Sequence, residues 1–231
     1  GSQARDAKEK MVYFGPWETY FLVAEALERQ WVTPGEVGGL TAENAYNKAV
    51  ELSFIHFGVS QYYSTYITST DYNRVGTSVA YNHTTPASTV TMKYVDGYTD
   101  QEGTVQYQYP DGTRTLYGNQ LNDHLSKIFT QKYIAQLPYL VQECWSDYRR
   151  VGLPFFDIIA NEKMMTGTDM TEWDPESWKS GQKWQYYPQR MRYPTTLDNA
   201  NPTEYKHALE LLGGANTTMV PLWWSLAYSQ K

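Results

Sequence analysis

The residues that could carry chemistry in this chain do not form a familiar catalytic set. Glu143 and Asp147 are four positions apart, so on a helix they share one face, beside Arg149 and Arg150. Paired carboxylates can hydrolyse glycosidic bonds. Two neighbouring arginines instead favour ion pairs that hold the helices and nearby loops together. The pattern therefore predicts a structural role for this group.

The other reactive side chains also stand without suitable partners. Cys144 is the single cysteine, which excludes an internal disulfide and a multi-thiolate metal site, and its helical context predicts a buried, unreactive thiol. The acidic loop with Asp96, Asp100 and Glu102 does not match a calcium-binding EF-hand loop. No metal-ligand spacing such as HExxH is present among the four histidines, which are His56, His83, His124 and His207. We therefore predict no catalytic residue, no metal site and no cofactor.

Aromatic residues are the unusual feature of the composition. They make up 16% of the chain, with 21 Tyr and 8 Trp. Tyr and Trp suit binding surfaces because each combines a large apolar face with a polar group. Nucleic acid is an improbable partner because the net charge is −6 and no basic stripe stands out. No apolar run reaches the roughly 18 residues that a membrane-spanning helix needs. The composition favours a binding module over an enzyme.

Residues 3–59 are expected to form a helical hairpin. A helix is predicted over 16–30, starting at Pro16, and a second one runs from a cap at Thr41 to a stop at Gly58. The first helix has one buried stripe, formed by Trp17, Tyr20, Phe21, Ala24 and Leu27. The second has a face of small residues that allows close helix packing, formed by Ala42, Ala45, Ala49 and Leu52.

Residues 60–118 differ in character, since they contain ten of the 21 Tyr. Apolar residues alternate with polar ones in two stretches, and the dipeptides 96–97 and 111–112 (both Asp-Gly) are turn signals. The alternating residues are Val90, Met92 and Tyr94, followed by Val105, Tyr107 and Tyr109. The pattern predicts one or two short β-hairpins on a long insertion between helices.

Residues 119–154 are expected to form a second helical hairpin. The periodicity predicts a helix over 119–137 that ends at Pro138, and another over 139–150 with Val141, Trp145 and Tyr148 facing inward. The first of these helices has an apolar face formed by Leu121, Leu125, Ile128 and Ala135. The loop-rich tail, 155–231, has one clear helix over 202–212, between a cap at Asn201 and the glycines 213–214. The chain is thus predicted to be mainly α, with tetratricopeptide-like helical hairpins, long ordered loops and a small β-hairpin insertion.

Six segments in order resemble the SusD/RagB family of outer-membrane nutrient-binding lipoproteins of Bacteroidetes. Segment 20–26 (YFLVAEA) resembles the family's YLIxAEA helix, and 45–59 resembles its LYNxGVxASFEYWGV segment. Segments 128–135 (IFTQKYIA) and 143–154 (ECWSDYRRVGLP) are similar to IxxQKWIA and EAWxDYRRTGYP. Two further matches lie towards the end of the chain, at 188–194 (PQRMRYP) and 222–224 (LWW). The resemblance covers the C-terminal half of the family pattern, and the Tyr-rich insertion departs from it.

The resemblance implies a cell-surface glycan-binding lipoprotein of a SusCD-like uptake system for polysaccharide utilisation. It would deliver its ligand to a SusC-like TonB-dependent transporter. Its partners would be an oligosaccharide or peptide ligand and the N-terminal half of the same protein. The lipid anchor would lie on an N-terminal segment absent here, since Gly1-Ser2 is typical of a cloning scar. Two alternatives stay open: a peptide-binding RagB-like uptake protein, or an accessory domain of a helical glycoside hydrolase.

Candidate ligand residues are chosen as aromatics in predicted loops, where binding usually resides. The family motif residues in the second helical hairpin are assigned to structure. The predicted ligand-binding residues are Tyr72, Tyr81, Tyr94, Tyr98, Tyr107, Trp173, Trp178 and Trp184.

Overall fold

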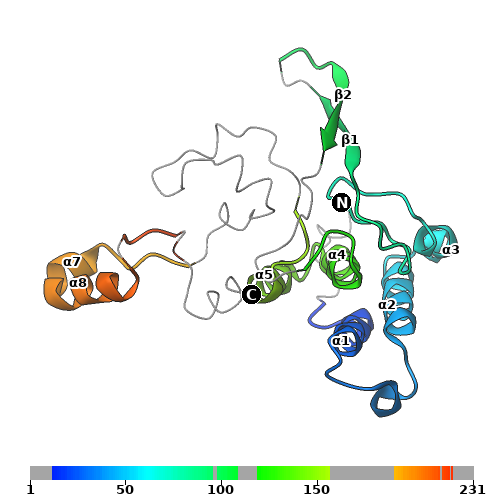
Figure 1. Cartoon of the computed structure of the whole chain (residues 1–231), viewed down its shortest axis with the longest axis horizontal. Helices are drawn as coiled ribbons and strands as arrows, with labels where there is room; N and C mark the ends of the chain where they lie inside the picture. Colours follow the sequence, from blue (N-terminus) through cyan, green and yellow to red (C-terminus); the bar gives the residue numbers. More distant parts are fainter. Residues whose placement is uncertain are drawn as a thin grey trace. The chain divides into compact units, whose positions relative to one another are not determined.

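The computed structural model describes residues 12–95, 98–108, 119–156, 190–213, 215–218 and 220. Two compact units make up the chain: unit 1 is residues 1–109 with 119–158, and unit 2 is residues 110–118 with 159–231. Helices form most of the regular structure, with one β-hairpin (Figure 1), which confirms the predicted fold class. Within the described ranges, no helix has both the length and the apolar character needed to cross a membrane.

The first described helix of unit 1 is α1 (Pro16–Glu28), whose first position is occupied by proline. Proline suits this position because the missing N–H would have no helical partner there. Trp17, Phe21 and Ala24 are buried, which confirms the predicted stripe, while Tyr20 and Leu27 lie at its half-buried edges. The helix ends two residues earlier than predicted.

A 3₁₀ turn, η2 (Pro34–Val37), leads to helix α2 (Ala42–His56). The Thr41 side chain caps α2 by accepting a hydrogen bond from the Asn44 N–H at 3.2 Å. The small residues Ala45 and Ala49 are fully buried, so α2 can approach α1 closely. Helices α1 and α2 therefore pack against each other as a helical hairpin.

The insertion starts with helical rather than β structure, in η3 (Ser60–Tyr62) and α3 (Tyr63–Ile67). An irregular segment, residues 69–87, which we call the strap, then leads into strand β1 (Thr89–Val95).

Strand β1 pairs antiparallel with β2 (Glu102–Gln108) and confirms one predicted β-hairpin. The register pairs Val90 with Tyr107 and Met92 with Val105, so the two alternating apolar sets occupy opposed positions. The predicted turns at 96–97 and 111–112, and Tyr109, lie outside the described residues.

Helix α4 (His124–Gln136) begins five residues after the predicted start at Asn119, and that part of the prediction was wrong. Asn122 has a φ of 63°, a left-handed conformation that cannot continue a helix. Asp123 then caps the helix by accepting a hydrogen bond from the Ser126 N–H at 2.6 Å. Leu121 is buried, as expected, but it lies before the helix.

Helix α5 (Val141–Val151) is rotated relative to the prediction. Val141 and Trp145, expected to point inward, are 55% and 47% exposed, whereas Tyr148 is buried as predicted. The inner face is instead formed by Cys144, Tyr148 and Val151. The periodicity of apolar residues predicted the wrong inward face for α5, because polar and charged residues of this helix have buried partners on α1 and α4.

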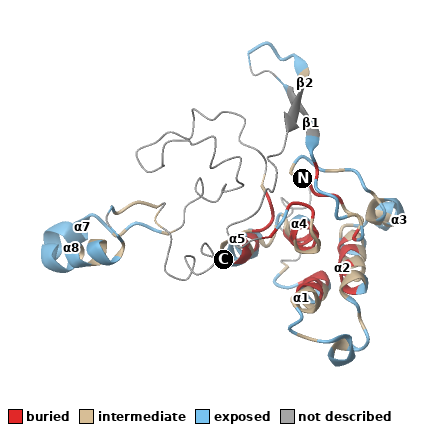
Figure 2. Cartoon of the chain, in the orientation of Figure 1, coloured by how far each residue is buried: buried red, intermediate tan, exposed pale blue. Residues whose placement is uncertain are grey.

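Two buried clusters form the core of unit 1 (Figure 2). The larger one joins α1, α2 and α4, and includes Phe21, Tyr46 and Ile128. The smaller one joins the start of α4 to the end of α5, and includes Phe129 and Leu153. Helices α1, α2 and α4 therefore form the scaffold onto which the strap packs.

Unit 2 contains the short helix α7 (Thr196–Ala200), which was not predicted, and α8 (Pro202–Leu211), which was. The Asn201 side chain caps α8 by accepting a hydrogen bond from the Glu204 N–H at 3.3 Å. Local sequence signals were sufficient here because the cap and the proline at the first position both act within one turn.

Candidate functional site

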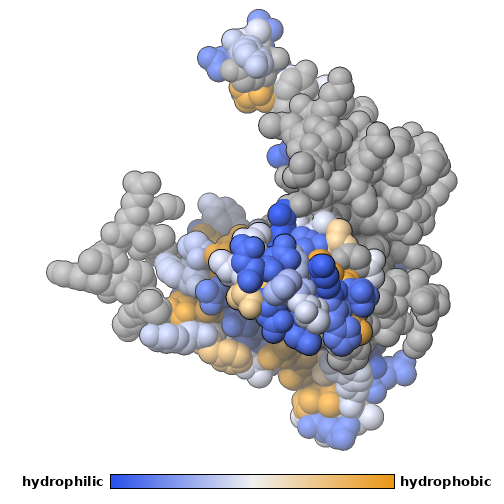
Figure 3. All heavy atoms as spheres, turned by 90° about the vertical axis from the view of Figure 1, so that its left-hand side faces the viewer, coloured by the Kyte–Doolittle hydropathy of each residue, from blue (hydrophilic) through white to orange (hydrophobic). Residues whose placement is uncertain are grey.

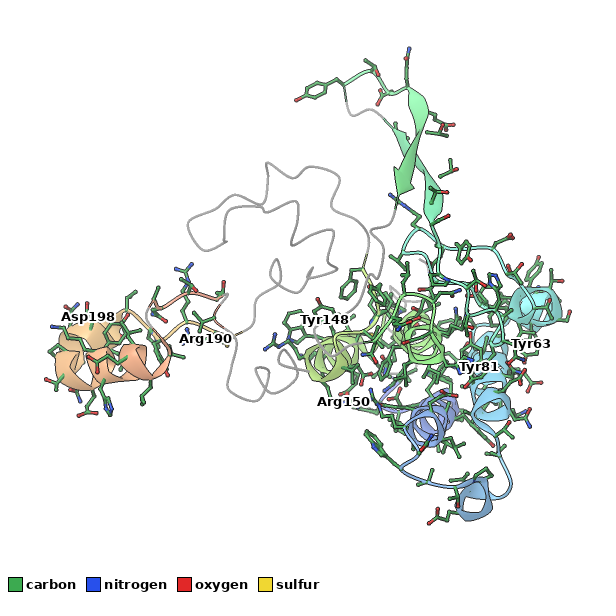
Figure 4. The ribbon with its side chains drawn as sticks, in the orientation of Figure 1. Tyr63, Tyr81, Tyr148, Arg150, Arg190 and Asp198 are labelled. Atoms are coloured by element: carbon green, nitrogen blue, oxygen red, sulfur yellow. The ribbon has the colours of Figure 1, made fainter. Side chains whose placement is uncertain are left out.

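A chain of charges joins α1, α4 and α5, and all its members except Arg150 are largely buried. The Lys132 amine lies 2.8 Å from a Glu18 oxygen and 2.7 Å from an Asp147 oxygen. Asp147 also pairs with Arg150 at 3.0 Å, and Arg150 makes two parallel hydrogen bonds to Glu25, at 2.7 and 2.8 Å. Three helices that are distant in sequence are thereby tied by ion pairs, as predicted for Asp147 and Arg150. Figure 4 labels Arg150 on α5.

The pKa values of these groups follow from their burial and partners. Burial by itself would raise the pKa of Glu25, but the hydrogen bonds and charge of Arg150, then of Arg29, outweigh it and hold the pKa below its ordinary value. Burial opposes the charge on Lys132, but Asp147 and then Glu18 raise its pKa. Glu25 and Lys132 are therefore ionised at neutral pH, and the arrangement is a structural lock.

This lock predicts a specific loss of stability in acid. The depressed pKa of Glu25 contributes stability that is present above its unfolded-state pKa, near 4.5, and is lost as the pH falls through the lower folded value. The free energy of unfolding, measured by chemical denaturation between pH 6 and pH 3, should fall less steeply in Glu25→Gln than in the parent. Glu51→Gln is the control, because Glu51 forms an exposed pair with Lys48 and should leave the slope unchanged. Equal slopes in Glu25→Gln and the parent would contradict this assignment.

Cys144 lies beside this lock and is buried, as predicted. Burial, and then the negative charge of Asp147, raise the pKa of its thiol to about 11. Its sulfur lies 3.2 Å from the side-chain oxygen of Gln136, whose amide group donates to Glu18 at 2.7 Å. The thiol is thus protonated at neutral pH, and it belongs to the same group of polar contacts between α1, α4 and α5.

A second polar centre fixes the strap to α4. The amine of Lys127, fully buried, donates to the Ser78 carbonyl at 2.8 Å, the Ser78 hydroxyl at 2.7 Å and the Asn122 side-chain oxygen at 2.7 Å. The Asn122 amide group in turn donates to the carbonyls of His83 and Thr85. Burial lowers the pKa of Lys127 to about 8, although the charge of Asp123 opposes the shift. These polar contacts therefore anchor the strap, which leads into the base of the β-hairpin, on the helices. No periodicity of apolar residues in the sequence marks them.

Tyr81, a predicted ligand residue, belongs to the core of this structure. It is 6% exposed, its hydroxyl donates to Glu28, and its ring stacks on His124 with centroids 4.2 Å apart. The ring also contacts Tyr46 (Figure 4 labels Tyr81). Because both its ring and its hydroxyl have partners here, no face is left for a ligand, and we reassign Tyr81 to the scaffold.

The remaining predicted ligand residues are distributed as follows. Tyr72 is half-buried and donates from its hydroxyl to the Thr85 carbonyl at 3.0 Å. Tyr98, near the turn of the β-hairpin, is fully exposed. Tyr94 lies in β1 and Tyr107 in β2, and their side chains are not among those described. Trp173, Trp178 and Trp184 lie outside the described residues. The ligand role of this set stays a prediction.

Several exposed aromatics were not selected from the sequence. Trp31, between α1 and η2, is 64% exposed, with the Arg29 guanidinium 5.2 Å from its ring centre. Tyr62 is 63% exposed and Trp145 is 47% exposed. These three residues belong to different parts of unit 1, so its accessible aromatic rings are dispersed. On the side seen in Figure 3, the coloured atoms are mostly hydrophilic, with hydrophobic areas small and separate.

The buried acids Glu18 and Glu25 were also missed, although a signal was present. They are seven positions apart in α1, next to the apolar residues Trp17, Phe21 and Ala24, so they share the inward side of the helix. A carboxylate at such a position needs a buried cationic partner.

The fold and this polar lock define a helical scaffold protein that presents a Tyr-rich insertion and contains no metal-binding cluster within the described ranges. The chain belongs to the SusD-like family, described as SusD and RagB outer-membrane lipoproteins, whose family model matches residues 2–225.

Two solved structures have a similar fold. A chitin-binding SusD homologue from Flavobacterium johnsoniae is 24% identical with a TM-score of 0.53, over 90% of this chain and 35% of that one. A SusD homologue from Bacteroides vulgatus is 23% identical with a TM-score of 0.51, over 90% of this chain and 34% of that one. The chain thus spans about a third of the length of these structures. No curated protein matches it.

Proposed function

We propose that this chain is part of a cell-surface glycan-binding lipoprotein of a SusCD-like uptake system, which delivers its ligand to a TonB-dependent transporter. The observation that carries the proposal is the family match over residues 2–225. The lipid anchor, the SusC-like transporter and the rest of the protein would complete the system. Its action is capture and transfer, with no bond made or broken.

The β-hairpin is the part of unit 1 that we propose for ligand contact. The strap beneath it is held on the helices by Lys127 and Asn122, and is therefore part of the scaffold. Tyr98 presents a fully exposed ring near the turn of the hairpin. Sugar rings have flat C–H faces that stack on aromatic rings, and stacking on tyrosine fixes only two side-chain torsions.

The chemistry of the ligand can be tested at single tyrosines by calorimetry. The probes are chitin oligosaccharides, because one solved relative is described as chitin-binding, with a panel of other oligosaccharides and peptides. For a cognate oligosaccharide, Tyr98→Ala should weaken binding about two- to tenfold, as expected when one stacked ring is removed. Tyr62→Ala is the matched control, since Tyr62 is also an exposed tyrosine but lies in η3, outside the hairpin.

A second variant tests the hairpin as a whole. Replacing residues 89–108 with a short Gly/Ser loop leaves the strap and its anchors in place, whereas a deletion of 60–118 would also remove Ser78 and Tyr81 from the scaffold. If the hairpin replacement binds its oligosaccharide as tightly as the parent, the hairpin is not the site. Binding of peptides alone would favour a RagB-like peptide-uptake protein, and hydrolysis of any probe would refute the capture mechanism.

A further inference from the structure

The chain segments on both sides of the β-hairpin are fixed at or near one buried side chain, that of Asn122. On the entering side, Thr85 lies four residues before β1, and its carbonyl accepts a hydrogen bond from the Asn122 amide group at 2.6 Å. On the returning side, Asn119 is the first residue described after β2. It is buried, and its amide group donates to the Val151 carbonyl at 3.0 Å. The contacts that fix the hairpin to the helices therefore gather around the start of α4.

Every polar atom of the Asn122 side chain has a partner. Its Oδ1 atom accepts hydrogen bonds from the Ser78 N–H at 2.8 Å and from the Lys127 amine at 2.7 Å. Its Nδ2 atom donates to the carbonyls of His83 at 2.9 Å and Thr85 at 2.6 Å. A carboxamide has two donor hydrogens and two acceptor lone pairs, so this arrangement uses both donors and the oxygen. One side chain thus holds the strap at three points.

The backbone at this position also suits asparagine. Its φ of 63° lies in the left-handed region, which asparagine adopts more readily than most residues other than glycine. This conformation places Asn122 directly before Asp123, the cap of α4. The side chain is fully buried, so it links the start of α4 to the strap without contact with solvent. The position requires both a left-handed backbone and a carboxamide, and asparagine combines them.

Other contacts of the strap do not replace this link. Tyr81 is bonded to α1, but it lies eight residues before β1. Tyr72 donates to the same Thr85 carbonyl at 3.0 Å, but it belongs to the strap itself. Ala87 is buried in the smaller cluster, where its methyl group makes apolar contacts that have no preferred direction. The bond from Asn122 therefore gives the entry to β1 a directional tie to α4.

We propose that Asn122 is a positioning residue for the β-hairpin, whose amide group holds the segment entering β1 and so keeps the hairpin in one orientation on the helices. Its effect on ligand binding rests on the proposed function, in which the hairpin presents Tyr98 to an oligosaccharide. Asn122 is buried and acts only through the strap. A hairpin held in its binding orientation gains affinity, because the apparent Kd rises as the fraction of molecules in that orientation falls.

Distances between two nitroxide labels test this positioning without a ligand. The labels are attached to Thr19→Cys, at an exposed position of α1, and Gln101→Cys, at an exposed position beside the hairpin turn. Cys144 is buried, and the pKa of its thiol is raised to about 11, so at neutral pH it stays unlabelled. The distribution of label distances then reports how uniformly the hairpin is held against α1.

Two variants remove the tie in different ways. Asn122→Asp keeps the acceptor for Lys127 and removes both hydrogens that reach the strap carbonyls. Asn122→Gly tolerates the left-handed backbone and removes the whole side chain, and it decides the question if the first variant does not fold. Both should broaden the distance distribution. Val50→Ala, which removes buried methyl groups from α2 and so weakens the core outside the strap, should leave it narrow. Equal distributions in the parent and both Asn122 variants, or equal broadening in Val50→Ala, would overturn the proposal.

Calorimetry with chitin oligosaccharides and the wider probe panel separates this inference from the proposed function. For a probe that the parent binds, the Asn122 variants should raise the Kd about three- to tenfold, as when between a third and a tenth of the molecules keep the binding orientation. Val50→Ala should leave the Kd unchanged. Broadened distances with an unchanged Kd would refute the role of Asn122 in binding. If the parent binds none of the probes, the proposed function fails, and the label distances alone decide whether Asn122 positions the hairpin.

Discussion

Replacing Lys132 with alanine is expected to lower the free energy of unfolding by about 3–5 kcal/mol. The Lys132 amine lies between Glu18 and Asp147, at 2.8 and 2.7 Å, and its side chain is only 5% exposed. The two carboxylates are 8% and 13% exposed. Without the lysine, both anions stay largely desolvated, and this cost exceeds the net value of the ion pairs themselves. Chemical denaturation at neutral pH gives the measurement.

Lys48 is the control for Lys132, because it forms a similar ion pair that is exposed to solvent. Lys48 forms an ion pair with Glu51 at the same 2.7 Å, but the two side chains are 44% and 39% exposed. Lys48→Ala should therefore cause a much smaller loss, because water solvates the remaining carboxylate. The double variant Lys132→Met with Glu18→Gln should recover part of the stability lost in Lys132→Ala. Similar losses for Lys48→Ala and Lys132→Ala would show that burial does not determine the value of these pairs.

The second large effect is expected at Trp17, where substitution by alanine should cost about 3–5 kcal/mol. Trp17 is 3% exposed, its ring lies 4.6 Å from that of His56, and it packs in the cluster shared by α1, α2 and α4. Removing the ring leaves a cavity that rigid helices cannot fully close. Denaturant unfolding should therefore show a lower midpoint with an unchanged slope.

Trp145 is the matched comparison for Trp17. The inward position predicted for Trp145 would have given it the same large cost, but it is 47% exposed on α5. Trp145→Ala should therefore cost about 1 kcal/mol or less. Trp17→Phe should be milder than Trp17→Ala, since a ring is retained and the indole N–H has no hydrogen-bond partner in the part of the chain described. A larger loss at Trp145 than at Trp17 would reverse this account of the core.

The position of the lock bears on the proposed capture function. The SusD-like segments that contain Glu25, Lys132, Asp147 and Arg150 hold helices together through ion pairs. The lock is built from residues of α1, α4 and α5, and none of them belongs to β1 or β2. Specificity in binding proteins commonly depends on loops carried by rigid elements. If the proposed function is correct, ligand identity should therefore follow the β-hairpin rather than the motifs.

The sequence by itself determined the elements that depend on near neighbours. Thr41 and Asn201 were recognised as helix caps because a cap bonds an N–H three residues ahead. The β-hairpin was recognisable because a period of two and a turn dipeptide are local signals. The ordered motif segments also indicated the family that the match over residues 2–225 confirms.

Only the tertiary structure decided which polar side chains lie inside. Arg150 and Glu25 meet across 125 residues, and Ser78 and Lys127 across 49. No local period encodes such pairs, since each charge is tolerated in the interior only where a distant partner compensates its lost hydration. The same reason explains the wrong phase of α5 and the burial of Tyr81. Their orientations follow from the polar partners on other helices, whereas hydrophobic periodicity reflects only the apolar contribution to the free energy of folding.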